Sequence, residues 1–264
     1  MFASIGSESH AFAQLPAPEI KEIATSDGSV LVIPVGSIEQ HGDHLPVATD
    51  TMLVSHVVSG AIEQLDELPV LSTPPVWCGY SPHHLSLGGT VSGEFETLRA
   101  HLTEIATTGL QNGFDAAIFV NGHGGNKALI EAVVSEVGAD HPETEVLGTT
   151  YFELDVDLID DVRDSETGGM AHGGEFETSL LLYLDDELVG EDRPATYFEE
   201  SYDLAGGDLI EGGPLAVYRS FEEYSASGAI GDPSLASSEK GKQLYNGLTD
   251  ALSTCIREIN AHQT

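Results

Sequence analysis

The segment SVLVIPVG, residues Ser29 to Gly36, is a continuous apolar run that ends in glycine. A run of this kind is typical of a strand buried on both faces of a parallel sheet. Comparable apolar runs follow at 70–76, 115–120 and 145–151. The chain is therefore expected to build its sheet from these segments.

Segments with helical spacing alternate with the apolar runs. They lie at 50–64, 92–113, 126–137 and 178–184. Ser92 is expected to cap the second, because Glu94 and Glu96 then fall in its first turn, where negative charge is favourable. Strands that alternate with helices predict an α/β fold whose parallel sheet is covered on both faces. No internal repeat interrupts the pattern, and we expect one domain over residues 1–264.

Two segments are expected to lie outside this pattern. The acidic connection 155–164 is interpreted as a solvated loop. The segment 202–232 is rich in Gly, Ser and Glu with scattered aromatic residues, and it fits a long surface excursion better than a second domain.

The charge balance excludes several classes of partner. The chain carries 9 Lys and Arg against 44 Asp and Glu, a formal net charge of −35. A field of that sign repels nucleic-acid phosphates and anionic lipid, so neither nucleic acid nor a membrane surface is an expected partner. Such self-repulsion is better tolerated where salt is high, which favours a protein of a salt-rich cytoplasm over an ordinary acidic enzyme.

Cysteine usage and the lack of targeting features indicate where the protein is expected to be found. Cys78 and Cys255 are far apart and lack a CxxC spacing, so neither a disulfide framework nor a cysteine zinc site is predicted. Residues 1–15 lack the basic and apolar regions of a signal peptide, and no run approaches the ~20 apolar residues of a membrane span. A cytoplasmic protein is expected.

Three polar clusters lie where a parallel sheet binds ligands, beyond the carboxyl ends of strands or at the start of a helix. They are Glu39–His44 with Asp50 shortly after, Asn121–Asn126, and His172–Ser179. Each combines histidine with carboxylates or glycines. The isolated histidines are interpreted as ordinary solvated side chains, namely His10, His56, His101, His141 and His262.

Imidazoles and carboxylates without thiolates suit Zn²⁺, Mn²⁺ or Fe²⁺. Glu39 and His41 are two residues apart, so on an extended segment both point to the same side, and Asp50 can join them from the next helix. A carboxylate shared between two ions roughly 3.5–4 Å apart is a common arrangement for hydrolysis. Gly124 and Gly125 beside His123 allow substrate to approach closely.

These motifs together resemble the creatininase (creatinine amidohydrolase) family, over nearly the whole chain from about Ile20. The matching segments are Pro34–Gly42, His44–Pro46 with Thr49-Asp50, Asn121–Asn126, His172–Ser179 and Gly228–Pro233. The resemblance implies a three-layer αβα sandwich with a mainly parallel central sheet, commonly assembled as homo-oligomers, and as hexamers in particular.

The resemblance also implies a centre of two divalent ions, Zn, Mn or Fe. Glu39, Asp50 and His123 would hold one ion, and His41, the same Asp50 and Glu177 the other. His172 is the implied carrier of a proton from the attacking water to the leaving nitrogen, with Glu175 the next candidate. The segment 79–84 resembles a substrate loop, so Ser81 and His84 are expected to contact the substrate together with Gly124 and Gly125.

Departures from the family pattern bear on the substrate. Creatininases carry a Glu ligand where this chain has Gly125, and they close tryptophans over the substrate, whereas this chain has only Trp77. The leading hypothesis is therefore a metal-dependent amidohydrolase acting on a small molecule with a non-peptide C–N bond, in a cyclic amide or a formamide. The archaeal formamidopyrimidine-nucleotide deformylases are one candidate branch of the family, because the acidic composition is consistent with a salt-adapted archaeon. Creatinine hydrolysis, peptide trimming and a non-catalytic metal- or ligand-binding module remain as alternatives.

Overall fold

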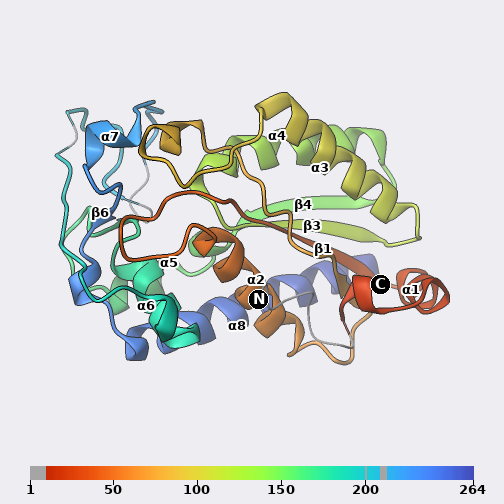
Figure 1. The fold of residues 1–264 in the computed structure, drawn as a ribbon. Coiled ribbons are helices and arrows are strands. Elements are labelled where there is room, and N and C mark those ends of the chain that lie inside the picture. Colours follow the sequence, from red (N-terminus) through yellow and green to blue (C-terminus); the bar gives the residue numbers. More distant parts are fainter. Residues whose placement is uncertain (1–9, 200, 209–212) are drawn as a thin grey trace.

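Parallel strands form the central sheet of the computed structural model, which describes residues 10–199, 201–208 and 213–264 (Figure 1). In chain order the strands are β1 (Val30–Val35), β2 (Val70–Ser72), β3 (Ala116–Asn121) and β4 (Glu145–Thr150). They lie in the order β2-β1-β3-β4, and Val30 of β1 pairs with Val70 on one side and Ala116 on the other. The prediction of a mainly parallel sheet is confirmed.

Helices cover both faces of this sheet, which gives the three layers (Figure 1). On one face lie α1 (Ala17–Ala24), α3 (Phe95–Leu110) and α4 (Lys127–Asp140). On the other lie α2 (Thr49–Ile62), α5 (Val156–Val162), α6 (Glu175–Leu184) and α8 (Ser238–Gln263). Side chains of β1 alternate between the two: Leu31 and Ile33 pack under α3 and α4, whereas Val30 and Val32 join the core of α2 and α8.

Short elements complete the described chain. The strands β5 (Met170–His172) and β6 (Ile230–Gly231) pair antiparallel, and α7 (Phe221–Tyr224) precedes β6. Short 3₁₀-helices occupy Phe12–Gln14, Pro82–Leu87, Gly124–Asn126, Tyr151–Glu153, Asp186–Leu188 and Pro233–Leu235. None of the helices in the described part of the chain is long and apolar enough to span a membrane.

Several expected boundaries were wrong; helix α6, for example, begins at Glu175 and not at Thr178. The second apolar run stops being a strand at Ser72, because Pro74 and Pro75 have no N–H to donate to the ladder. Helix α3 begins at Phe95, with Glu94 and not Ser92 at its N-cap. The hydroxyl of Ser92 instead accepts a hydrogen bond from the backbone N–H of Ser81, at 2.9 Å.

The acidic segment 155–164 is a helix, α5, and not the loop expected from its charge. The carboxylate of Asp155 caps the helix by accepting from the N–H of Leu158, at 3.0 Å. Ile159 is fully buried against the core of α8. One well-placed apolar side chain and a cap therefore outweigh the acidic composition.

Candidate metal centre

The three polar clusters meet in one buried place. Glu39 and His41 follow β1, Asp50 lies in the first turn of α2, and His123 follows β3. Glu177 comes from α6, and His172 ends β5. All six residues are buried, with exposed fractions of 9% or less. Ionisable groups buried this deeply need partners of opposite charge.

Asp50 lies between two imidazoles. Its Oδ1 is 3.2 Å from Nε2 of His41, and its Oδ2 is 3.3 Å from Nδ1 of His123. Glu177 Oε1 approaches the same His41 nitrogen at 3.6 Å, and Glu39 Oε2 lies 3.2 Å from Nε2 of His123. Each histidine thus faces two carboxylates, and Asp50 is common to both.

The ring orientation of His41 suits a metal ligand. Its Nδ1 donates to the backbone carbonyl of Glu39, at 3.0 Å, which leaves the lone pair of Nε2 facing the carboxylates of Asp50 and Glu177. Within the described chain, Nε2 of His41, both carboxylate oxygens of Glu39 and Oδ2 of Asp50 are buried without a hydrogen bond. A divalent cation satisfies such a set of facing lone pairs, so these residues fit one.

Two further histidines join the cluster. His172 Nδ1 lies 3.8 Å from Glu39 Oε1, and His84 Nε2 lies 3.2 Å from the same oxygen. Among the described residues, ligand atoms within 4.8 Å of one another form three groups: Glu39, His41 and Asp50; His41, His172 and Glu177; and Glu39, His84 and His172. His84 was expected to contact the substrate. In the structure it lies beside the carboxylate of Glu39.

The electrostatics of the cluster favour a cation at its centre. Burial alone would lower the pKa of His123, but the carboxylates of Glu39 and Asp50 outweigh it and raise that pKa to about 10. Burial would raise the pKa of Asp50, yet the neighbouring His41 and His123 hold it well below its usual value. Asp50 thus stays ionised because positive charge lies beside it, whereas burial raises the pKa of Glu39 above its ordinary value.

His172 differs from the other two histidines. Burial and the neighbouring His41 lower its pKa well below the ordinary value, so the ring is neutral. Its Nε2 donates to the backbone carbonyl of Gln40, at 2.7 Å, and its Nδ1 faces the cluster. A neutral imidazole with a free lone pair can accept a proton or bind a metal.

Glu175 does not join the cluster. Residues two apart on a helix point in nearly opposite directions, so Glu175 faces away when Glu177 faces the centre. Its carboxylate contacts the ammonium of Lys240 and accepts from the N–H groups of Asp164 and Ser165, at 3.0 and 2.9 Å. The proton-carrying role considered for Glu175 has no support in this geometry.

The expected substrate contacts surround the centre. Ser81 is buried, with its hydroxyl 3.1 Å from Nε2 of His123 and 2.7 Å from the hydroxyl of Ser37. Gly124 lines a small inner cavity of about 100 Å³ beside Glu39, Asp50 and His172. At Gly125 a Cβ would lie only 2.4 Å from Nε2 of His123, so no side chain fits there without moving that ring.

Phe221 was not found from the sequence. It comes from the segment 202–232, and its ring centroid lies 3.8 Å from that of His84 and 4.7 Å from that of His172. No spacing or motif marks an aromatic residue so far along the chain. Among the isolated histidines, His10 is buried and not solvated: its Nδ1 lies 3.0 Å from the carbonyl oxygen of Val70.

Buried imidazoles and carboxylates at the carboxyl ends of parallel strands form a candidate metal centre in a protein of the α/β class. The family model of creatininase, described as creatinine amidohydrolase, matches residues 13–256. The chain belongs to the creatininase family and is a hydrolase of that family. This confirms the resemblance seen in the motifs.

Relatives of different function share this family. A mycofactocin precursor peptide peptidase of Mycobacterium ulcerans is 31% identical, with 92% of each chain covered. A creatinine amidohydrolase of Pseudomonas putida is 29% identical, with 87% of this chain and 89% of the relative covered. A crystal structure of creatinine amidohydrolase has the same fold, with a TM-score of 0.79, 24% identity and coverage of 94% and 96%.

Proposed function

We propose that the protein is a metal-dependent amidohydrolase that uses two divalent ions to hydrolyse a non-peptide C–N bond. The observation that carries the proposal is Asp50, whose two oxygens face two different imidazoles, those of His41 and His123. Glu39 lies beside His123, and Glu177 lies beside His41. Together with the shared Asp50, each pair makes a set of three ligands. Zn²⁺, Mn²⁺ and Fe²⁺ suit these nitrogen and oxygen ligands.

The proposed division of ligands is the one that the family resemblance implies, and these contacts support it. Glu39, Asp50 and His123 would hold one ion, and His41, Asp50 and Glu177 the other. When bound, such a pair supplies a water of lowered pKa and polarises the carbonyl of the substrate. The tight packing at Gly125 supports a ligand set without a carboxylate at that position.

His172 is the proposed proton carrier. An amide nitrogen leaves readily only when it is protonated, and a positioned imidazole typically contributes ~10²–10⁴-fold to that step. Nδ1 of His172 faces the cluster and can take a proton from water and pass it to the leaving nitrogen. Meanwhile Nε2 keeps its own proton on the carbonyl of Gln40, which stabilises the charged ring.

A cyclic amide or a formamide is the proposed substrate class, and creatinine itself is disfavoured. Trp77, the single tryptophan, is 50% exposed and is not among the residues that line the inner cavity. The described residues therefore do not form a site in which tryptophans close over creatinine. Peptide trimming is the second candidate, favoured by the 31% identity to a peptide peptidase.

Metal content and product analysis test this proposal together. Purified protein should contain up to two divalent ions per chain and should hydrolyse members of a panel of ring amides, formamides, creatinine and short peptides. Ammonia, formate or a free amino acid as product separates the candidates. A metal-loaded protein that hydrolyses no member of the panel would favour a binding module instead.

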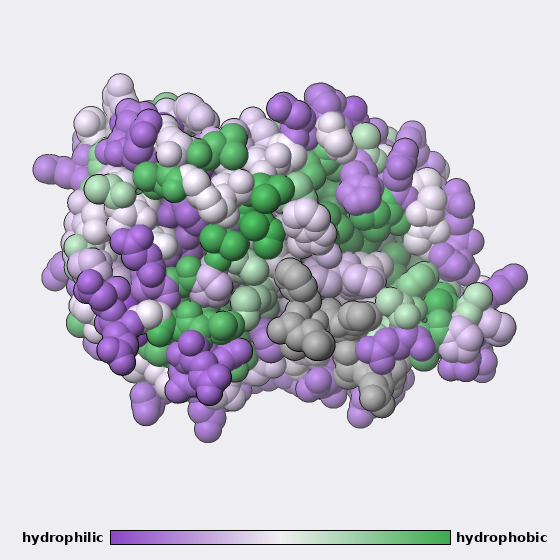
Figure 2. All heavy atoms as spheres, in the orientation of Figure 1, coloured by the Kyte–Doolittle hydropathy of each residue, from purple (hydrophilic) through white to green (hydrophobic). Residues whose placement is uncertain are grey.

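The cellular setting is also part of the proposal. We infer a homo-oligomer, a hexamer by family resemblance, in the cytoplasm of a salt-adapted cell. The charge of −35 supports the salt adaptation, and hydrophilic residues are spread widely over the face drawn in Figure 2. Light scattering at molar salt tests the assembly: a monomer at that salt concentration would contradict it.

A further inference from the structure

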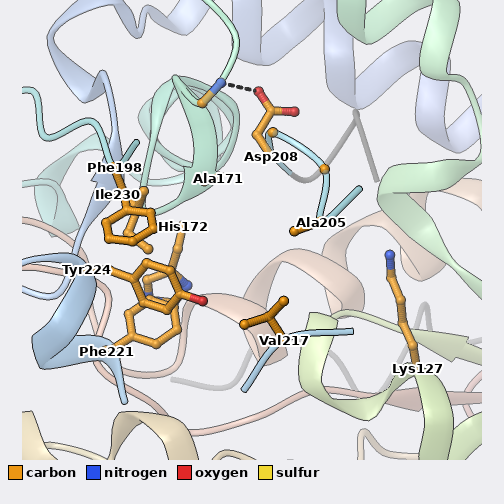
Figure 3. A pocket seen from close by; sticks show the side chains of 13 residues that line it. Lys127, Ala171, His172, Phe198, Ala205, Asp208, Val217, Phe221, Tyr224 and Ile230 are labelled. Atoms are coloured by element: carbon orange, nitrogen blue, oxygen red, sulfur yellow. Dashed lines mark hydrogen bonds between the residues drawn. The ribbon is translucent and has the colours of Figure 1, made fainter. Parts of the chain in front are cut away.

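A second, larger cavity lies next to the metal centre. It has a volume of about 300 Å³, three times the inner cavity, and shares Ala171, His172 and Phe221 with it. Figure 3 shows His172 and Phe221 on one side of this outer cavity and Lys127 on the other. A molecule whose reacting bond lies beside His172 can therefore extend into the outer cavity.

One wall of the outer cavity is aromatic and apolar. The ring centroid of Tyr224 lies 4.6 Å from that of Phe198 and 5.4 Å from that of Phe221, so the three rings form a continuous surface. Val217 and Ile230 also line the cavity (Figure 3). A wall of this kind favours a planar or apolar group of the ligand by stacking and by exclusion of water.

The opposite side carries a positive charge. Lys127 is the only lysine or arginine among the described residues that line the outer cavity. Its ammonium is 2.5 Å from Oε1 of Glu153 and 5.1 Å from the ring centroid of Phe152, contacts that fix its place. An ammonium has three donors, so Lys127 keeps hydrogen-bonding capacity for a ligand.

The one acidic residue among the described lining residues has its charge already matched. Asp208 accepts from the guanidinium of Arg163 at 2.9 Å and from the N–H of Gly168 at 2.9 Å, the latter drawn as a dashed line in Figure 3. Asp208 therefore does not oppose an anion in the cavity as a bare carboxylate would. Lys127 is also ion-paired, with the partly exposed Glu153, so an anionic ligand would share its ammonium with that carboxylate.

We propose that the outer cavity binds the part of the substrate remote from the hydrolysed bond, an aromatic or apolar group that ends in a carboxylate or a phosphate. This inference rests on the proposed function, because it takes His172 as the place of reaction. It narrows the substrate to acidic amides that are larger than the inner cavity alone can hold.

Calorimetric titration of the metal-loaded protein tests the cavity with ligands that cannot be hydrolysed as amides. The ligands are 3-phenylpropanoate, phenyl phosphate, the neutral 3-phenylpropan-1-ol, and propanoate, which lacks the ring. One of the two aromatic anions should bind at least about fivefold tighter than both the neutral alcohol and propanoate, as expected for one partly exposed ion pair and one buried ring. The preferred anion identifies carboxylate or phosphate as the natural group.

Variants separate Lys127 from the metal ions, which also attract anions. Lys127→Met should abolish the preference for the aromatic anion over the alcohol, and Lys127→Arg should retain it. Lys242→Met removes the same charge from an exposed position on α8 and should leave the preference unchanged. Equal preference in Lys127→Met and Lys242→Met, or no binding of any aromatic ligand, would overturn the inference.

The two proposals fail in different ways. Hydrolysis of the amide panel without binding of the aromatic anions overturns the outer-cavity inference alone. Binding of those anions that depends on Lys127, without hydrolysis of any amide, overturns the proposed function alone.

Discussion

Asp50→Asn tests the bridging carboxylate at the heart of the proposed centre. Asparagine keeps the size of the side chain but removes the charge and one acceptor oxygen. The two oxygens of Asp50 lie 3.2 and 3.3 Å from nitrogens of His41 and His123, so one substitution weakens the sites of both ions. Glu177→Gln, by contrast, weakens one of the two.

The expected magnitude follows from the burial of the cluster. Removing one partner of a buried ion pair typically costs about 3–5 kcal/mol, and Asp50 is 2% exposed between two histidines. Applied to metal binding, the same loss lowers the affinity at least about a hundredfold, at ~1.4 kcal/mol per factor of ten. After dialysis we expect Asp50→Asn to retain less than one ion per chain, and Glu177→Gln to retain about one.

Elemental analysis after dialysis is the assay, with the melting temperature in the presence and absence of added metal as a second readout. Asp43→Asn is the matched control, because Asp43 lies in the same segment after β1 but is exposed. Two ions per chain in Asp50→Asn would refute the bridging role and, with it, the proposed division of ligands.

Three further predictions follow from the structure. His172→Ala should lower turnover by ~10²–10⁴-fold while both ions stay bound; loss of one ion would show that His172 is a ligand, and unchanged turnover would exclude it as proton carrier. The melting temperature should rise steeply between dilute and molar KCl, because the charge of −35 is screened; a value independent of salt would contradict the halophilic interpretation. Burial lowers the pKa of His44 from 6.5 to about 4, so the folded state binds fewer protons than the unfolded chain, and stability should fall as the pH drops from about 6.5 to about 4. Denaturant titrations should show this fall in the wild type and a shallower one in His44→Asn; equal slopes would contradict the assignment.

Much of the fold could be predicted from hydrophobic patterning. The buried strands β1 and β3 are continuous apolar runs, and such runs have few other stable arrangements in a parallel sheet. The errors arose where a local contact outweighs composition. In α5 a cap by Asp155 and the burial of Ile159 stabilise a helix in an acidic segment. The burial of Ile159 depends on the packing of α8, which lies about 90 residues further along the chain.

The candidate site was predictable to the extent that its residues lie in short motifs. Glu39 and His41 share an extended segment, and strand ends in a parallel sheet meet at one edge, so their approach to His123 follows from topology. Phe221 and the partner of Glu175, Lys240, lie far away in the sequence, and their positions depend on how long connections fold. Motif spacing carries no information about such contacts.

Removal and return of the metal shows whether hydrolysis depends on bound ions. The protein is treated with a chelator at the salt concentration that keeps it folded, and hydrolysis of the amide panel is measured before treatment, after it, and after addition of Zn²⁺, Mn²⁺ or Fe²⁺. We predict that activity disappears with the metal and returns with at least one of these ions at up to two ions per chain. Full activity in a preparation shown to be free of metal would exclude a metal-dependent hydrolase.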